Sequence, residues 1–273
     1  MEKIKIGYSP CPNDTFIFDA LVHGKIDTEG LEFEVHHADV EELNRLAFAG
    51  ELPVCKLSYH AFAHLWKDYQ LLRAGSALGN NCGPLLVAAG PFSEEEVAGA
   101  KIAIPGQHTT ANFLLSFAFP AAQQRQEYLF SDIEGAVLGG QVDLGLLIHE
   151  NRFTYAQRGL HKVMDLGQYW EEQTGLPIPL GGIAVRRDLP EELKQKIGRL
   201  LRKSVEYAFA HPLASAEYVA EHAQEMDVEV CRQHINLYVT ENSIDFGPKG
   251  EAAIAQLMQS LDIQADLPLW VAI

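Results

Sequence analysis

The sequence predicts an α/β fold in which strands and helices alternate along most of the chain. Over the first two thirds, short apolar segments typical of buried strands alternate with segments whose apolar residues recur every three or four positions. From Pro190 onward the periodicity is almost wholly helical. The chain has 273 residues, which suits one large domain or two lobes and is long enough to bury a core without disulfides.

The first third of the chain predicts three strand–helix units. We expect strands at residues 3–8, 31–37 and 54–57 and helices at residues 15–23, 40–49 and 58–66. Gly24 and Gly50 stand directly after the first two helices, where glycine commonly ends a helix. The first and third strands each run into a turn that is rich in residues typical of helix starts.

The middle of the chain predicts a second α/β segment. We expect strands at residues 85–89, 102–104, 142–148 and 183–187, and helices at residues 111–119, 131–138 and 164–174. Proline and glycine interrupt the pattern at 90–92 and again at 177–182, and such breaks favour chain crossings between lobes. The sequence therefore predicts an inserted lobe at 92–180, and a discontinuous lobe made of 1–91 plus 181–273 that the C-terminal helices cover.

The charge balance is strongly acidic. Lys and Arg number 21 against 37 Asp and Glu, which gives a net charge of −16. Such a chain repels phosphate backbones and anionic lipids, so we expect no nucleic-acid or membrane partner. A small anionic molecule remains a possible partner if a pocket supplies local donors. The sequence makes no prediction of oligomeric state.

Several sequence features favour a cytoplasmic protein. The N-terminus leads directly into a strand, without the apolar region of a signal peptide, and no run of about 18 apolar residues is present. The four cysteines, at positions 11, 55, 82 and 231, form no C-x-x-C pair. This spacing is typical of free thiols in a reducing compartment.

Three predicted strands end in polar groups that also begin a helix. These polar segments are residues 9–14, 55–58 and 107–110. The N-terminus of a helix exposes unpaired N–H groups that bind anions, and open α/β sheets bind ligands beyond the carboxyl ends of their strands. Together these segments favour a site for a small anionic ligand. Ordinary helix capping by Ser, Thr, Asn and Asp is the alternative.

Two titratable residues lie within or directly after predicted buried strands. Lys56 lies in a strand that otherwise reads as buried, so it is either paired, facing a ligand, or reaching solvent from the strand edge. His149 directly follows the apolar run 144–148. An imidazole at a strand end is suited to general-base catalysis near neutral pH, although a lone histidine at such a position is more often a hydrogen-bonded structural residue.

The sequence supports no metal or nucleotide cofactor. His60 and His64 lie four residues apart and share a helix face, but no third ligand stands at a suggestive spacing, so we expect no metal. Neither a Rossmann fingerprint nor a P-loop is present. The G-x-S-x-G elbow of serine hydrolases is also absent.

Six local strings resemble one enzyme family. They are SPCPNDTFIF (9–18), KLSY (56–59), PGQHTT (105–110), IHENRFTY (148–155), WEEQTGLPIPLG (170–181) and YAFAHP (207–212). These strings resemble the 1,4-dihydroxy-6-naphthoate synthase family of the futalosine route to menaquinone. They span most of the chain, and the first alone places a cysteine between two prolines before Asn-Asp.

The resemblance implies a fold, a reaction and a set of site residues. The implied fold is two-lobed and periplasmic-binding-protein-like (type 2), with the ligand cleft between the lobes. The implied activity is that of a carbon–carbon lyase without a cofactor, which converts cyclic dehypoxanthine futalosine to 1,4-dihydroxy-6-naphthoate. His149 corresponds to the proton acceptor, while the implied substrate-binding residues are Lys56, Leu57, Ser58, Thr109, Thr110 and Ala111, with Asn13 as a further candidate.

Some points remain open at this stage. Ser58, Asn13 or a water molecule are alternatives for protonating the departing fragment. Asn151 stands where the family commonly has Ser or Gly. Three other functions compete with the synthase: a chorismate dehydratase-like enzyme of the same pathway, a non-catalytic protein that binds a small carboxylate, and a ligand-binding regulatory domain. The SPCPND and IHE strings favour the synthase.

Overall fold

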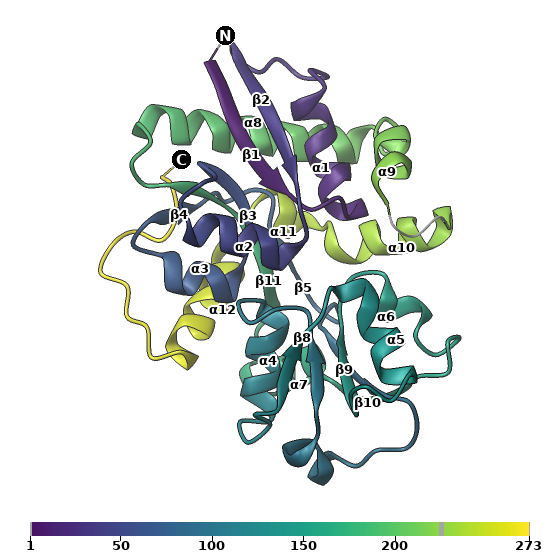
Figure 1. The fold of residues 1–273 in the computed structure, drawn as a ribbon. Coiled ribbons are helices and arrows are strands. Elements are labelled where there is room, and N and C mark those ends of the chain that lie inside the picture. Colours follow the sequence, from purple (N-terminus) through teal and green to yellow (C-terminus); the bar gives the residue numbers. More distant parts are fainter. Residues whose placement is uncertain (1, 224–226, 273) are drawn as a thin grey trace. The chain divides into compact units, whose positions relative to one another are not determined.

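The computed structural model describes residues 2–223 and 227–272 and divides into two compact units. Unit 1 comprises residues 1–79 and 179–273, and unit 2 comprises residues 80–178. In Figure 1 the purple start and the green-to-yellow end of the chain build unit 1 together. The first crossing lies earlier than the sequence boundary of 91/92, because strand β6 (Leu85–Ala88) pairs within the sheet of unit 2.

The sheet of unit 1 has the strand order β2-β1-β3-β11-β4, and β5 pairs with β11. Its strands are β1 (Glu2–Tyr8), β2 (Leu31–His37), β3 (Val54–Ser58), β4 (Tyr69–Leu71), β5 (Ala77–Gly79) and β11 (Ile178–Arg186). Strands β2 and β3 run parallel to β1, whereas β11 runs antiparallel to β3 and β4. The carboxyl ends of β1 and β3 therefore meet at one edge, which places Ser9 and Ser58 at the same end of the sheet.

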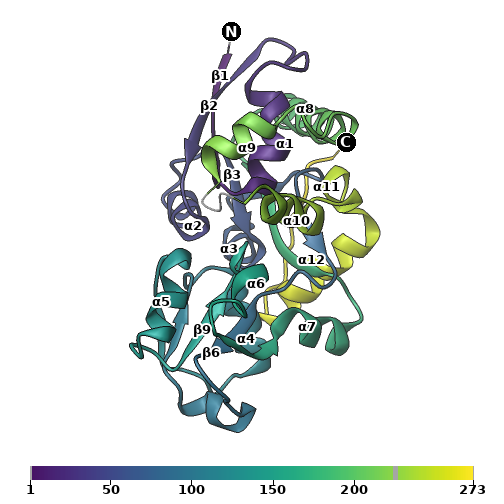
Figure 2. The ribbon, with the colours of Figure 1, turned by 90° about the vertical axis from the view of Figure 1, so that its right-hand side faces the viewer.

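Helices cover both faces of this sheet (Figure 2). They are α1 (Pro12–Val22), α2 (Val40–Phe48), α3 (Tyr59–Leu65), α8 (Glu191–Ala210), α9 (Ala216–His222), α10 (Val228–Tyr238), α11 (Glu241–Ile244) and α12 (Gly247–Ser260). Ile4 and Ile6 of β1 belong to the core cluster formed with α1 and α8. Gly7 faces the other way, and a Cβ there would lie only 2.5 Å from Leu52 and 3.0 Å from Leu43 of α2.

The sheet of unit 2 has the order β10-β6-β9-β7-β8. Its other elements are the 3-10 helices η1 (Glu94–Gly99) and η2 (Phe130–Asp132), strands β7 (Ile102–Ile104), β8 (Arg125–Glu127), β9 (Leu144–Leu147) and β10 (His161–Asp165), and helices α4 (Thr110–Ala118), α5 (Ile133–Leu138), α6 (Asn151–Thr154) and α7 (Leu166–Thr174). Strands β7 and β9 are parallel neighbours. Their carboxyl ends therefore deliver Thr109 and His149 to the same edge.

Several elements differ from the sequence prediction. The strands β4, β5 and β8 have three residues each, which is too short for apolar periodicity to show. The helix expected at 164–174 begins only at Leu166, because Asp165 caps it and Met164 still belongs to β10. Strand β11 also starts earlier than expected and passes through Gly181 and Gly182.

The two glycines in β11 are explained by close packing. A Cβ on Gly181 would lie 2.8 Å from the Leu57 carbonyl oxygen, and one on Gly182 would lie 2.8 Å from the Tyr59 hydroxyl. Glycine inside a strand often marks such a close approach rather than a turn. The cysteines are free thiols, as their spacing predicted, and all four are buried. Among the described residues, every helix is too short or too polar to cross a membrane.

Candidate active-site residues

Asp14 is the centre of a buried polar network at the carboxyl ends of β1 and β3 in unit 1. It lies in the first turn of α1 and is only 1% exposed. Its carboxylate accepts hydrogen bonds from Ser9 Oγ at 2.7 Å, from Ser9 N at 3.3 Å and from Asn13 Nδ2 at 2.9 Å. The Lys56 ammonium lies 3.0 Å from Asp14 Oδ1. A buried carboxylate requires this many donors, because burial without partners is costly.

Lys56 is therefore a paired charge rather than one that reaches solvent. Its side chain is 8% exposed, and its ammonium also donates to the Gly75 carbonyl oxygen at 3.1 Å. The sequence left pairing and ligand binding open, and the structure supplies the pair. An ammonium has three N–H bonds, and the partners among the described residues take two of them. One donor direction remains for a ligand.

Asn13 is held by a residue from the far end of the chain. Its Oδ1 lies 2.8 Å from Nε2 of His234, a fully buried histidine on α10. The Asn13 amide nitrogen faces the Asp14 carboxylate, so its oxygen faces His234 and the Nε2 atom must carry the proton. Asn13 thus orients Asp14, and His234 orients Asn13.

Ser58 and Leu57 occupy the end of β3. Ser58 is 3% exposed, its backbone N–H donates to Asn44 Oδ1 at 3.1 Å, and its Oγ accepts from Asn44 Nδ2 at 3.3 Å. Its hydroxyl proton is therefore still available as a donor. Leu57 is 1% exposed and belongs to the core, so its side chain is a packing group rather than a ligand contact.

A second cluster, made of tyrosine and histidine side chains, lies at the carboxyl ends of β1 and β2. The hydroxyl oxygens of Tyr8 and Tyr218 are 2.6 Å apart, and His37 Nε2 lies 3.0 Å from the Tyr218 hydroxyl. The His37 ring also packs against His222, with 4.6 Å between centroids. Burial, and secondly the nearby His222, lowers the pKa of His37 below its ordinary value. Burial raises the pKa of Tyr8, so both groups are neutral near pH 7.

In unit 2, Thr109, Thr110 and Ala111 form the start of α4. Thr109 is the N-cap: its Oγ1 donates to the Gly106 carbonyl oxygen at 2.8 Å and accepts from Asn112 N at 3.2 Å. All three predicted residues are at most 5% exposed. The Thr109 hydroxyl is thus engaged in capping, and it already takes up the Asn112 N–H; the positive end of the helix dipole is what this helix start presents to an anion.

His149 stands at the end of β9 in an unusual backbone conformation. Its φ is +57°, in the left-handed region that residues with a Cβ rarely adopt. Its ring packs edge-on against Phe130, with 4.9 Å between centroids and 62° between planes. Non-glycine residues in this region cluster at functional sites, where neighbouring structure holds them in place. The sequence gives the position of His149 but not this conformation.

His60 and His64 do share a face of α3, as their spacing predicts. Their Nε2 atoms lie 3.4 Å apart, which is a hydrogen-bond distance between imidazoles. Each ring therefore has a hydrogen-bonding partner in the other.

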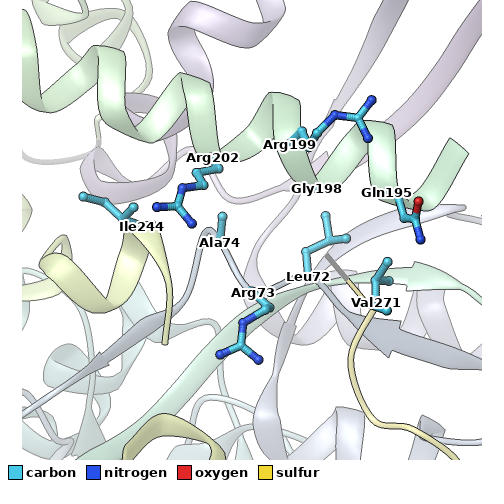
Figure 3. Close-up of a pocket in the computed structure, with 10 residues that line it drawn as sticks. Leu72, Arg73, Ala74, Gln195, Gly198, Arg199, Arg202, Ile244 and Val271 are labelled. Carbon is cyan, nitrogen blue, oxygen red and sulfur yellow. The ribbon is translucent and has the colours of Figure 1, made fainter. Parts of the chain in front are cut away.

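A hollow beside α8 lies away from the strand edge (Figure 3). It is lined by Leu72, Arg73, Ala74, Gln195, Gly198, Arg199, Arg202, Ile244, Val271 and Ala272. Its three arginines are all paired with carboxylates, namely Asp245 and Glu251, Glu29, and Glu206. The hollow contains none of the predicted site residues, and its cations are already compensated.

Comparison with known proteins identifies the family. Residues 4–262 match the family model described as menaquinone biosynthesis. The chain belongs to the menaquinone biosynthesis family. A Thermus thermophilus member named 1,4-dihydroxy-6-naphtoate synthase is 49% identical over 257 residues, which cover 94% of this chain and 93% of that protein. A Streptomyces coelicolor member of the same name is 43% identical over 262 residues, covering 94% of this chain and 92% of that protein.

Solved structures agree with this family membership. A crystal structure of an Archaeoglobus fulgidus protein superposes with a TM-score of 0.90 at 39% identity, covering 95% of this chain and 97% of that one. A Candida albicans protein described as having the generic periplasmic binding protein fold gives a TM-score of 0.70 at 13% identity, covering 98% and 92%. The second likeness shows the fold alone. The predicted periplasmic-binding-protein-like fold is confirmed.

The sequence missed two residues of the unit 1 network. Asp14 was noted only as part of a helix start, although a lysine in a buried strand signals that a carboxylate must be near. His234 gave no local signal, because 221 positions separate it from Asn13.

Proposed function

We propose that this family member is a carbon–carbon lyase that converts cyclic dehypoxanthine futalosine to 1,4-dihydroxy-6-naphthoate, with His149 as the proton acceptor. The observation that carries the reaction is the 49% identity, over 94% of the chain, to a relative named for this product. The left-handed backbone of His149 at the end of β9 supports its role as the base.

The proposal names groups in each unit that are suited to binding an anion. Unit 1 offers the remaining N–H of Lys56 and the hydroxyl proton of Ser58. Unit 2 contributes the start of α4 at Thr110 and Ala111, where the helix dipole favours negative charge. The acidic chain supplies little general attraction for an anion, so these local donors carry the binding.

The chemistry needs one base and positioned donors. Neutral His149 removes a proton from the substrate, the carbon–carbon bond to the ribose-derived fragment breaks, and the ring system becomes aromatic. The departing fragment takes up a proton, so the step involves no net oxidation. Ser58 and water are better proton sources than Asn13, because an amide is a very weak acid and both ends of the Asn13 amide already have partners. A positioned base contributes about 10²–10⁴-fold in rate.

The test is product formation by the purified protein. Cyclic dehypoxanthine futalosine is supplied without added metal or nucleotide, and 1,4-dihydroxy-6-naphthoate is followed by absorbance and mass. We expect His149→Ala to lower kcat by about 10²–10⁴-fold. His161→Ala, which removes an exposed histidine of the same unit, is the matched control and should keep the wild-type rate.

Each other outcome redirects the assignment. Equal rates for wild type and His149→Ala would remove His149 from its role as the base. Consumption of chorismate in place of futalosine-derived substrate would move the protein to the dehydratase alternative. Tight binding of either compound without turnover would favour a non-catalytic carboxylate-binding protein.

A further inference from the structure

The left-handed conformation of His149 needs something to hold it. A residue with a Cβ leaves this region readily when the chain around it is free to move. On its N-terminal side, His149 is fixed by β9, which is paired in the middle of the unit 2 sheet. On its C-terminal side the chain enters α6, a helix of only four residues that has too few internal hydrogen bonds to be rigid alone.

Arg152 ties this short helix to the rest of unit 2. Its side chain is 13% exposed, and its guanidinium reaches three acceptors. Nη2 donates to the Asn81 carbonyl oxygen at 2.9 Å and to Asp165 Oδ2 at 3.1 Å, and Nη1 donates to the Gly83 carbonyl oxygen. A planar guanidinium with several fixed donors can bridge such a set, whereas the single ammonium of lysine cannot reproduce it.

The acceptors of Arg152 are themselves rigid. Asp165 is the N-cap of α7, and its other oxygen accepts from the backbone N–H groups of Gly167 and Gln168 at 3.0 Å each. The backbones of Gly83 and Gly167 touch so closely that a Cβ on Gly167 would lie 2.5 Å from the Gly83 Cα. The 81–83 segment and the start of α7 thus form one packed support to which Arg152 is fastened.

We propose that Arg152 is a positioning residue that, together with Asp165, holds His149 in its left-handed conformation and so aims the imidazole for proton transfer. The inference rests on the proposed function for its catalytic consequence, but not for its structural part. With β9 on one side and the Arg152 anchor on the other, the turn at His149 cannot relax toward an ordinary backbone conformation. Arg152 acts through His149 and needs no contact with the substrate.

The kinetic test compares arginine substitutions in the same segment. Arg152→Lys should lower kcat by about 10–100-fold while KM changes less than threefold, because a misplaced base slows proton transfer and the binding groups are intact. Guanidinium ions added at millimolar concentration should restore part of the rate of Arg152→Ala. Arg158→Lys is the matched control, since Arg158 follows α6 and pairs with Glu134 instead. A loss confined to KM, or no larger than that of Arg158→Lys, would overturn the proposal.

A stability test needs no turnover. In the wild-type background, His149→Gly removes the backbone strain and should raise Tm by about 2 °C. In an Arg152→Ala background the turn is already free to relax, so the same substitution should give no rise. Equal Tm shifts in both backgrounds would overturn the proposal that Arg152 holds His149 in its left-handed conformation. If wild type makes no product, the proposed function fails while this comparison still decides whether Arg152 holds His149.

Discussion

The buried Asp14–Lys56 ion pair should contribute strongly to the stability of the protein, and substitutions of its two residues test this. Asp14→Asn keeps the shape of the side chain but removes the charge that compensates a buried ammonium. Removing one partner of a buried pair costs about 3–5 kcal/mol. Asparagine can still accept from Lys56, but its amide nitrogen then faces the backbone N–H of Ser9, 3.3 Å from the oxygen it replaces. We therefore expect Asp14→Asn to lower the free energy of unfolding by about 3 kcal/mol.

Removing the other partner, Lys56, should destabilise the protein less. In Lys56→Met the carboxylate keeps its three other hydrogen bonds, two from Ser9 and one from Asn13, so we expect a loss of about 2 kcal/mol. The double variant leaves neither charge unpaired. Its loss should therefore be smaller than the sum of the single losses by about 1–2 kcal/mol.

The assay is urea unfolding followed by circular dichroism, with the midpoint and slope fitted for each variant. The matched control is Glu34→Gln, which breaks the exposed pair with Lys3 at 3.1 Å and should cost less than about 0.5 kcal/mol. An Asp14→Asn loss as small as that of the control would refute the reasoning. So would strict additivity in the double variant, because it would mean that the two charges do not compensate each other.

Two further predictions concern pH and packing. Because burial beside His222 lowers the pKa of His37 in the folded protein, the unfolded chain binds more protons there, and stability should fall as pH drops below the ordinary value of 6.5. Midpoints of urea unfolding at several pH values should show this slope, and His37→Gln should reduce it; an unchanged slope would contradict the assignment. In thermal unfolding, Gly167→Ala should lower the free energy of unfolding by about 1–3 kcal/mol, because the new Cβ would overlap with Gly83. Gly135→Ala has open space around it on α5 and should raise the free energy of unfolding by up to about 1 kcal/mol. Equal effects of these two substitutions would show that the close backbone contact carries no energy.

The local pattern of the sequence predicted most of the elements near the site. The alternation in residues 31–37 and the apolar run before His149 identified strands β2 and β9 within a residue or two. Both patterns reflect burial on the faces of a sheet, which each segment records in its own composition. The apolar runs of β3, β7 and β9 likewise placed Ser58, Thr109 and His149 at or just beyond strand ends.

Short or closely packed segments escaped prediction for a physical reason. Strand β8 is only Arg125–Glu127, and its strand character comes from pairing with β7 rather than from its own residues. Gly181 and Gly182 were assigned to a break in the pattern before the strand, but they lie within β11, where other backbone and side-chain atoms leave no room for a Cβ. Neighbours distant in sequence decided both cases.

The sequence by itself determined the fold class, the family strings and the strand ends that carry the candidate residues. Only the tertiary structure decided which groups meet there: Lys56 with Asp14, Asn13 with His234, and Arg152 with the support behind His149. It also decided the left-handed backbone of His149. Local propensity and burial are properties of short segments, whereas the partner of a buried charge is set by how distant segments pack together.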